Sequence, residues 1–204
     1  VESIAAAGPP AQVIVATDEM HDLPHWVTQV LVPAGSHMAD FFNACYAVAD
    51  TTWVWGIGVD DLFLPGAFDP IPSEADCYIV PSQMEDGSLF QYVGGFDKMY
   101  LTTTDLMYGA FFHRTALLRE MPMRRMPFID WAHFSEMSYF GKTVEWGSQP
   151  RSIWVRHPDA HCHEAPHEWH EQHWAFNERL AAGLIQMGQP EQYDPHTEMM
   201  QALA

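Results

Sequence analysis

The sequence predicts an α/β domain whose mostly parallel central sheet is flanked by helices. Residues 13–16 are a short, continuously apolar run, which is typical of a strand covered on both faces. A second strand over 28–32, a helix over 39–49 and an apolar strand from residue 51 follow in that order. Strands that alternate with a helix in this way usually form a parallel sheet, because a parallel return needs a crossover connection.

The remaining elements complete this pattern. Residues 2–7 have the composition of a helix end, and the helix over 39–49 carries an apolar stripe of Phe41, Cys45 and Val48. Beyond the strand that starts at residue 51 we expect a strand over 76–80, a turn at 85–87 and a strand over 89–93. A helix over 113–121, a loop over 121–127 and a helix over 128–140 follow, and strands over 143–146 and 152–155 come last.

Composition and charge limit the classes of partner. The chain has 204 residues, enough for one domain with a sizeable core. Its net charge of −18 repels a phosphate backbone, so we expect no nucleic-acid partner. No apolar run is long enough for a membrane span, and the first residues lack the positive segment of a signal peptide. Cys45, Cys77 and Cys162 form no CxxC pair, which fits a reducing compartment. These observations predict a cytoplasmic protein.

The chain divides into two predicted parts. Residues 1–160 hold the predicted strands and helices, and residues 161–204 form a His- and Glu-rich helix with a polar tail. His163 to His167 matches the letters HExxH of zinc proteases. Pro166 lies inside this match, however, and a proline interrupts the continuous helix that would place both histidines on one face. A zinc protease is therefore not predicted.

Two adjacent acids, Asp60 and Asp61, end the apolar strand that starts at residue 51, and Pro65 and Gly66 then stop it. A buried strand that ends in acids places hard oxygen ligands at the mouth of a sheet, where a divalent cation and a phosphate can meet. The alternative interpretation is that the two acids only cap a strand at a solvated turn.

Five stretches, taken in this order and spacing, resemble the motifs of one enzyme family. They are VIVATDE at 13–19, NACYAVA at 43–49, GVDDLFLPGA at 58–67, GAFFHRTAL at 109–117 and IDW at 129–131. The family is that of the inverting, family-2-like glycosyltransferases with a GT-A type fold, a Rossmann-like architecture that binds nucleotide sugars. The resemblance covers most of residues 2–161.

The resemblance implies transfer of a sugar, with inversion, from a nucleotide-sugar donor to an acceptor hydroxyl. Thr17 and Asp18 would contact the nucleotide, and Arg156 would pair with the diphosphate. Mg²⁺ or Mn²⁺, held by Asp60 and by His157 of a late R-x-H-P motif, would neutralise charge on the departing diphosphate. The acceptor, whether glycan, protein or small molecule, is left open, and so is assembly into a homo-oligomer.

The resemblance also implies that Asp130 is the general base that deprotonates the acceptor hydroxyl. Asp61 would orient the loop or touch the sugar, since it would point away from Asp60 if the strand continued. We expect Asp60 and Asp130 to converge on opposite sides of one cleft. Each residue also has a plainer interpretation: Asp130 as a helix-start acid favoured by the dipole, His157 as a structural histidine, and Arg156 as a salt-bridge partner.

The sequence departs from the family at three places. Gly58 stands where the first acid of the metal motif would be, and Ile129 stands where an acid usually precedes the base. The central first strand of a GT-A sheet has no counterpart before the helix end over 2–7, so either a truncated chain or a reduced fold is expected. A catalytically inactive binding or structural module with this fold is therefore the alternative function. A nucleotidyltransferase, which would share the acidic site, is a third.

Overall fold

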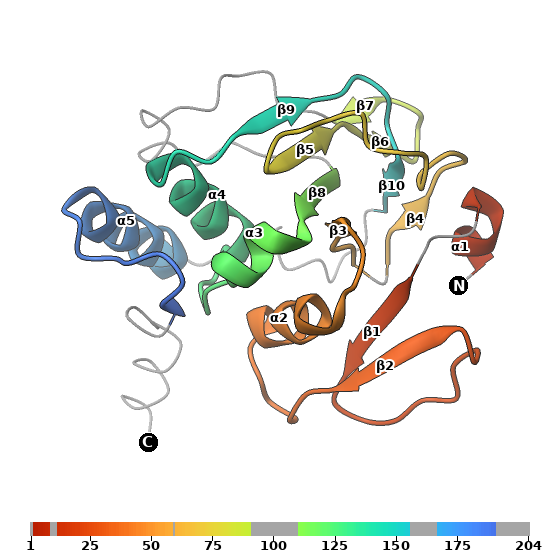
Figure 1. The fold of residues 1–204 in the computed structure, drawn as a ribbon, viewed down its shortest axis with the longest axis horizontal. Coiled ribbons are helices and arrows are strands. Elements are labelled where there is room, and N and C mark those ends of the chain that lie inside the picture. Colours follow the sequence, from red (N-terminus) through yellow and green to blue (C-terminus); the bar gives the residue numbers. More distant parts are fainter. Residues whose placement is uncertain (1, 9–11, 59, 91–109, 156–166, 191–204) are drawn as a thin grey trace.

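A computed structural model describes residues 2–8, 12–58, 60–90, 110–155 and 167–190. This part of the chain is a mixed α/β structure in which sheets are flanked by helices (Figure 1). The helices are α1 (Glu2–Ala7), α2 (Met38–Val48), α3 (Thr115–Glu120), α4 (Ile129–Tyr139) and α5 (His167–Ala181). The strands are β1 (Val13–Thr17), β2 (Val27–Leu31), β3 (Trp53–Trp55), β4 (Leu62–Phe63), β5 (Cys77–Val80), β6 (Ser82–Met84), β7 (Leu89–Phe90), β8 (Ala110–Arg114), β9 (Val144–Trp146) and β10 (Ser152–Trp154).

The prediction of a mostly parallel central sheet is wrong. The described strands form three sheets, in the orders β1-β2, β4-β10-β6-β7 and β3-β8-β5-β9. Three of their pairings are parallel and four are antiparallel. Strand β8 lies between β3 and β5 and runs antiparallel to both, so these two strands share a direction without pairing with each other. An apolar run indicates that a strand is buried, but it carries no information about the direction of the neighbouring strands.

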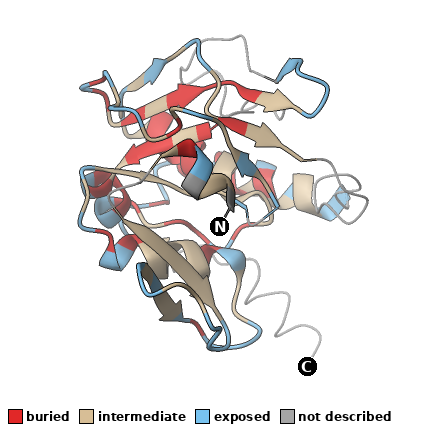
Figure 2. Cartoon of the chain, turned by 90° about the vertical axis from the view of Figure 1, so that its right-hand side faces the viewer, coloured by how far each residue is buried: buried red, intermediate tan, exposed pale blue. Residues whose placement is uncertain are grey.

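The paired strands β1 and β2 stand apart from the other sheets, as Figure 1 shows. Their pairing is parallel, in the register Val13 opposite Val27. All residues of β1 are only half-buried, although they are apolar enough to predict a strand covered on both faces (Figure 2). Helix α2 packs against β1, and Ala39 and Tyr46 of α2 share a core cluster with Val54 of β3, so this cluster links the small sheet to the larger one.

Helix α2 begins and ends within one residue of the predicted bounds, but a different face is packed. His37 caps its start, since the His37 side chain accepts from Ala39 N and the Asp40 carboxylate accepts from His37 N. The predicted stripe of Phe41, Cys45 and Val48 is shifted: Val48 is 45% exposed, whereas Ala39 and Tyr46 are buried and Phe42 and Cys45 pack beside them. The packed face is the one that meets Leu118 of α3 and Met123 of the loop after it.

Helix α4 fills the space between the sheet and α5. Residues 132–138 of α4 are all buried. On one side Phe134 and Met137 join a core cluster with Cys77 and Ile79 of β5. On the other side Ala132 joins a cluster with residues of α5 and of the loop after it: Phe176, Leu180 and Ile185. The predicted boundary at residue 160 lies outside the described residues, so the division into two parts stays a prediction.

A buried ion pair holds the loop before α4. Arg124 Nη2 donates to Glu136 Oε1 at 2.7 Å, and the two side chains are 1% and 2% exposed. Arg124 also donates to the carbonyl oxygens of Gln186 and Gln189. Burial raises the pKa of Glu136, although Arg124 favours its charged form. The pair therefore fixes the 121–127 loop to α4 and to the chain after α5.

We predict that Glu136→Ala strongly destabilises the protein. The substitution leaves the guanidinium of Arg124 buried without its counter-charge, which costs roughly 3–5 kcal/mol in the free energy of unfolding. Urea denaturation measures this loss. The matched control is Glu120→Ala, which removes the partner of Lys142 at 2.8 Å where Glu120 is 47% exposed, and its expected cost is under about 1 kcal/mol. Equal losses in the two variants would contradict the prediction.

Candidate functional site

The carboxylates of Asp60 and Asp61 gather over Gly58, beyond the end of β3. Strand β3 stops at Trp55, and a turn then closes with a hydrogen bond from Asp61 N to Gly58 O at 3.4 Å. A Cβ placed on Gly58 would collide with Asp60 Oδ1 and would lie 3.8 Å from Asp61 Oδ2. The strand thus does not continue through the pair, and both acids reach the same side of the turn.

Asp61 is fixed to the end of β10. Its Oδ1 accepts a hydrogen bond from Val155 N at 3.2 Å, and β4, which follows the pair, runs antiparallel to β10. Val155 immediately precedes Arg156 and His157, the predicted diphosphate and metal ligands, which lie outside the described residues. The backbone donor on Val155 was missed by sequence reasoning, because it depends on the pairing of two strands that are distant in the chain.

The acidic pair presents two of the predicted carboxylate ligands. Within the described residues, no group of three His, Cys, Asp or Glu side chains is arranged to hold a metal ion. Asp60 is exposed and Asp61 is half-buried, so both present hard oxygen ligands near solvent. Two carboxylates suit Mg²⁺ or Mn²⁺, which complete their shell with phosphate oxygens and water. The donor set therefore fits the predicted metal, with the phosphates of a ligand supplying further oxygens.

Gln29 of β2 organises the loop that follows β1. Its amide nitrogen donates to Thr17 Oγ1 at 2.9 Å and to Glu19 O at 3.0 Å, and its Oε1 accepts from His21 N at 3.3 Å. Asp18, between these anchored residues, is exposed. Thr17 and Asp18 therefore lie on an ordered turn at the carboxyl end of β1, the location expected for nucleotide contacts in an α/β sheet. Sequence reasoning missed Gln29, whose role depends on the register of β1 and β2.

Asp130 lies in the first turn of α4 and is half-buried. Its Oδ1 accepts a hydrogen bond from Trp131 N at 2.9 Å. Burial raises the pKa of Asp130, and the backbone hydrogen bonds offset only part of this effect. A carboxylate with a raised pKa is a stronger proton acceptor than an ordinary aspartate, so its environment suits a general base.

A chain of contacts connects Asp130 with β3. The residue before it, Ile129, packs on the cluster that contains Val54 of β3. The side chain of Asn43 in α2 binds both backbone groups of Met123: its Nδ2 donates to Met123 O and its Oδ1 accepts from Met123 N, each at 2.8 Å. Helix α2 thus joins the start of α4 to β3, whose far end leads to Asp60. That the two acids face one cleft stays a prediction.

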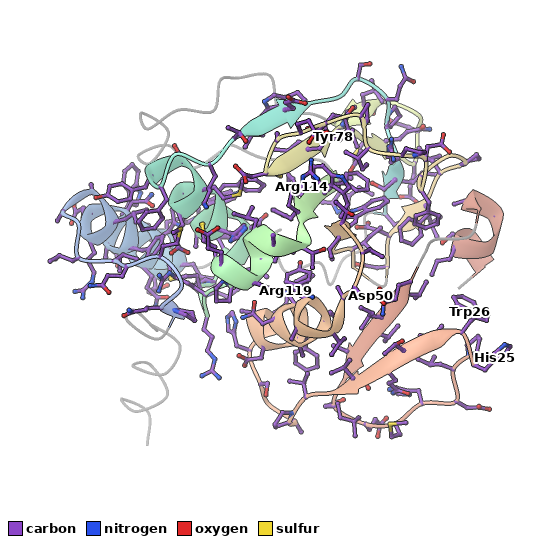
Figure 3. All side chains as sticks on the ribbon, in the orientation of Figure 1. His25, Trp26, Asp50, Tyr78, Arg114 and Arg119 are labelled. Atoms are coloured by element: carbon purple, nitrogen blue, oxygen red, sulfur yellow. The ribbon has the colours of Figure 1, made fainter. Side chains whose placement is uncertain are left out.

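Two arginines that sequence reasoning did not single out hold loops in place (Figure 3). Arg114 lies 4.4 Å from the ring centroid of Trp53 and donates to the carbonyl oxygens of Ser73 and Ala75. Arg119 donates to the carbonyl oxygen of Ala49 at 2.6 Å. These contacts give both arginines a structural role.

Two buried histidines, one on β8 and one on the same helix as Asp130, affect how the stability of the protein depends on pH. His113 of β8 and His133 of α4 have ring centroids 5.0 Å apart and are 4% and 1% exposed. Burial lowers the pKa of His113 to about 4. It lowers the pKa of His133 well below its ordinary value, as do His113 and Arg124 nearby. Both imidazoles are therefore neutral in the folded protein at pH values where the unfolded chain binds protons.

We predict that stability falls as the pH drops below about 6.5, because the unfolded state then binds more protons than the folded state. Each buried histidine contributes a loss of about 1.4 kcal/mol per pH unit, and for His113 the loss levels off near its folded pKa of about 4. Urea denaturation between pH 7 and pH 5 measures the slope. His113→Met should reduce it by one histidine's share, whereas His25→Asn, at an exposed site, should leave it unchanged. An unchanged slope in His113→Met would refute this origin.

No protein family model matches the sequence, and no curated protein matches it. Among the described residues, no helix combines the length and apolar character needed to cross a membrane. The site is therefore interpreted from its own residues and geometry.

Proposed function

We propose that this chain is a glycosyltransferase that moves a sugar from a nucleotide-sugar donor to an acceptor hydroxyl with inversion. The observation that carries the proposal is the gathering of the Asp60 and Asp61 carboxylates over Gly58, beyond the carboxyl end of β3. Hydrogen bonding to Val155 fixes Asp61 next to the segment that continues into Arg156 and His157. Carboxylates together with an arginine and a histidine are the residue types that suit the binding of a diphosphate and its metal.

The reaction assigns each step to a residue of the chain. The acceptor oxygen forms a bond to the anomeric carbon while the bond from that carbon to the diphosphate breaks, and the diphosphate leaves with the electron pair. Asp130 accepts the proton of the acceptor hydroxyl. Thr17 and Asp18 position the nucleotide, and Asp61 holds the loop of the donor site. Mg²⁺ or Mn²⁺, bound by Asp60 with His157, would neutralise negative charge on the leaving group.

The arrangement of the strands supports a GT-A type sheet that lacks one central strand in the described part of the chain. The edge of β1 opposite β2 and the edge of β3 opposite β8 have no strand partner among the described residues. Both strands pack against the same helix, α2. The proposed fold would have one further strand between β1 and β3, which would join β2-β1 and β3-β8-β5-β9 into a single sheet.

One observation favours the alternative, a binding or structural module with this fold and no catalysis. Gly58 stands where the family's metal motif has its first acid, and a Cβ at this position would displace the Asp60 carboxylate from its present position. A site with fewer carboxylates binds a divalent cation less tightly. Such a module would bind a nucleotide sugar without transferring its sugar.

We predict that a nucleotide-sugar donor with Mn²⁺ stabilises the protein through Asp60. At about 100 times Kd, binding adds roughly 2.7 kcal/mol to the free energy of unfolding, which raises Tm by roughly 5–10 °C in a chain of this size. Thermal melting with UDP- and GDP-sugars measures the shift. Asp60→Asn should abolish it, and Glu85→Gln, which removes an exposed charge on the β6–β7 turn, should preserve it. If neither donor raises the Tm of the wild type, the result contradicts both the glycosyltransferase and the nucleotide-sugar-binding module.

We predict that Asp130→Asn separates transfer from binding. Loss of a general base lowers the transfer rate by roughly 10²–10⁴-fold, while the Tm shift with donor and Mn²⁺ persists. In the wild type, transfer should decline on the acid side at a higher pH than for an ordinary aspartate, because burial raises the pKa of Asp130. Sugar transfer is followed by release of the nucleoside diphosphate in the presence of acceptor. Full activity in Asp130→Asn would remove Asp130 from the mechanism.

A further inference from the structure

Helices α4 and α5 run in the same direction, with their N-terminal ends side by side (Figure 1). At this end the ring centroid of Phe128 lies 5.0 Å from that of His170 and 5.8 Å from that of Trp169. At the other end Tyr139 packs on the cluster that contains Leu180. The first turns of both helices therefore meet at the place where Asp130 lies.

Four aromatic side chains at this junction form what we call the ring cluster: Phe128, Trp131, Trp169 and His170. Phe128 and Trp131 stack with ring centroids 4.4 Å apart, and Trp131 lies 6.3 Å from His170. All four are half-buried, which leaves part of each side chain accessible.

Burial increases sharply along α5 away from the ring cluster. One turn further on, His173 is 2% exposed, and Phe176 and Leu180 are 0% exposed. Packing between the helices is thus completed by the later residues of α5. Among the ring contacts described between α4 and α5, the accessible rings all lie at the end that carries Asp130.

Asp130 lies between two members of the ring cluster in the sequence. Phe128 precedes α4 and Trp131 is the third residue of the helix, so Asp130 lies in the chain between two residues whose rings stack. Because the Asp130 carboxylate accepts a hydrogen bond from Trp131 N, a ligand that packs on the Trp131 ring would have Asp130 in its neighbourhood. The ligand must therefore combine an apolar face with a hydroxyl that can give up a proton.

A pyranose ring has both properties, since its C–H face packs on aromatic rings and its hydroxyls make hydrogen bonds. Its hydroxyls also match the polar groups at the junction, the imidazole of His170 and the carboxylate of Asp130. The net charge of −18 disfavours an anionic ligand. These features select a neutral sugar.

We propose that the ring cluster binds the acceptor, and that the acceptor is a neutral, pyranose-containing glycan. The inference rests on the proposed function, because it assigns the acceptor to the site of Asp130. It also gives α5 a role in acceptor recognition that sequence reasoning did not assign to this helix.

Saturation-transfer NMR tests the inference without requiring activity. The probes are methyl β-D-glucopyranoside, methyl β-D-galactopyranoside and methyl α-D-mannopyranoside with the full chain. At least one should receive saturation at its C–H protons. Trp131→Leu and His170→Ala should each weaken its binding by about threefold to tenfold. The control Trp174→Leu alters a 40% exposed ring of α5 outside the ring cluster and should leave binding unchanged. If Trp131→Leu does not fold, Trp131→Phe replaces it and should retain sugar binding. The loss of binding is then measured in His170→Ala against the wild type.

The outcomes distinguish this inference from the proposed function. Loss of sugar binding in the ring-cluster variants, with the donor-induced Tm shift unchanged, supports both. Sugar binding without any donor-induced Tm shift supports the sugar site and contradicts the proposed glycosyltransferase activity. A donor-induced shift with no saturation of any of the three glycosides overturns the inference and leaves the transferase standing. Binding that is equal in the wild type and in both ring-cluster variants also overturns it.

Discussion

The two hydrogen bonds between Asn43 and Met123 are the constraint on which the arrangement of the site depends. They join residues 80 positions apart, and each is 2.8 Å long. Because both backbone groups of Met123 are bonded to one side chain, the 121–127 loop has a fixed position on α2. The next residue, Arg124, forms the buried pair with Glu136. The start of α4, and with it Asp130, is thereby held relative to α2 and to the β3 strand that α2 covers.

Helix α4 is held from several sides, and this explains its unusual composition. A helix buried all round would ordinarily be apolar, yet α4 buries His133 and Glu136 together with its apolar residues. Glu136 is matched by Arg124, while the nitrogens of His133 and His113 have no hydrogen-bond partner among the described residues. The polar residues cost stability, but they join the helix to a specific loop and strand. A rigid helix is also what a base needs if it is to be positioned to a fraction of an ångström.

The sequence was informative where structure is local. Apolar runs and helix ends predicted α2, α4, β1 and β5 nearly to the residue. Strand direction was not predictable, since the antiparallel pairing of β8 depends on neighbours far away in the chain. The very short β4 and β6 were missed for want of any periodicity. Strand β8 was missed too, and His113 and Arg114, which were predicted to begin a helix, are its last residues. Site residues follow the same division: the acidic pair is a local signal, whereas the contacts of Gln29 and Asn43 require a tertiary structure.

The same reasoning gives a physical meaning to Gly58. Two carboxylates that share one side of a turn repel each other, and in a protein of net charge −18 few cations are free to separate them. Val155 N donates a hydrogen bond to the Asp61 carboxylate. A Cβ on Gly58 would collide with Asp60 Oδ1, so the glycine leaves space for the Asp60 carboxylate in its present position. A divalent cation would convert their repulsion into attraction, and this is the strongest physical reason for a ligand at the turn.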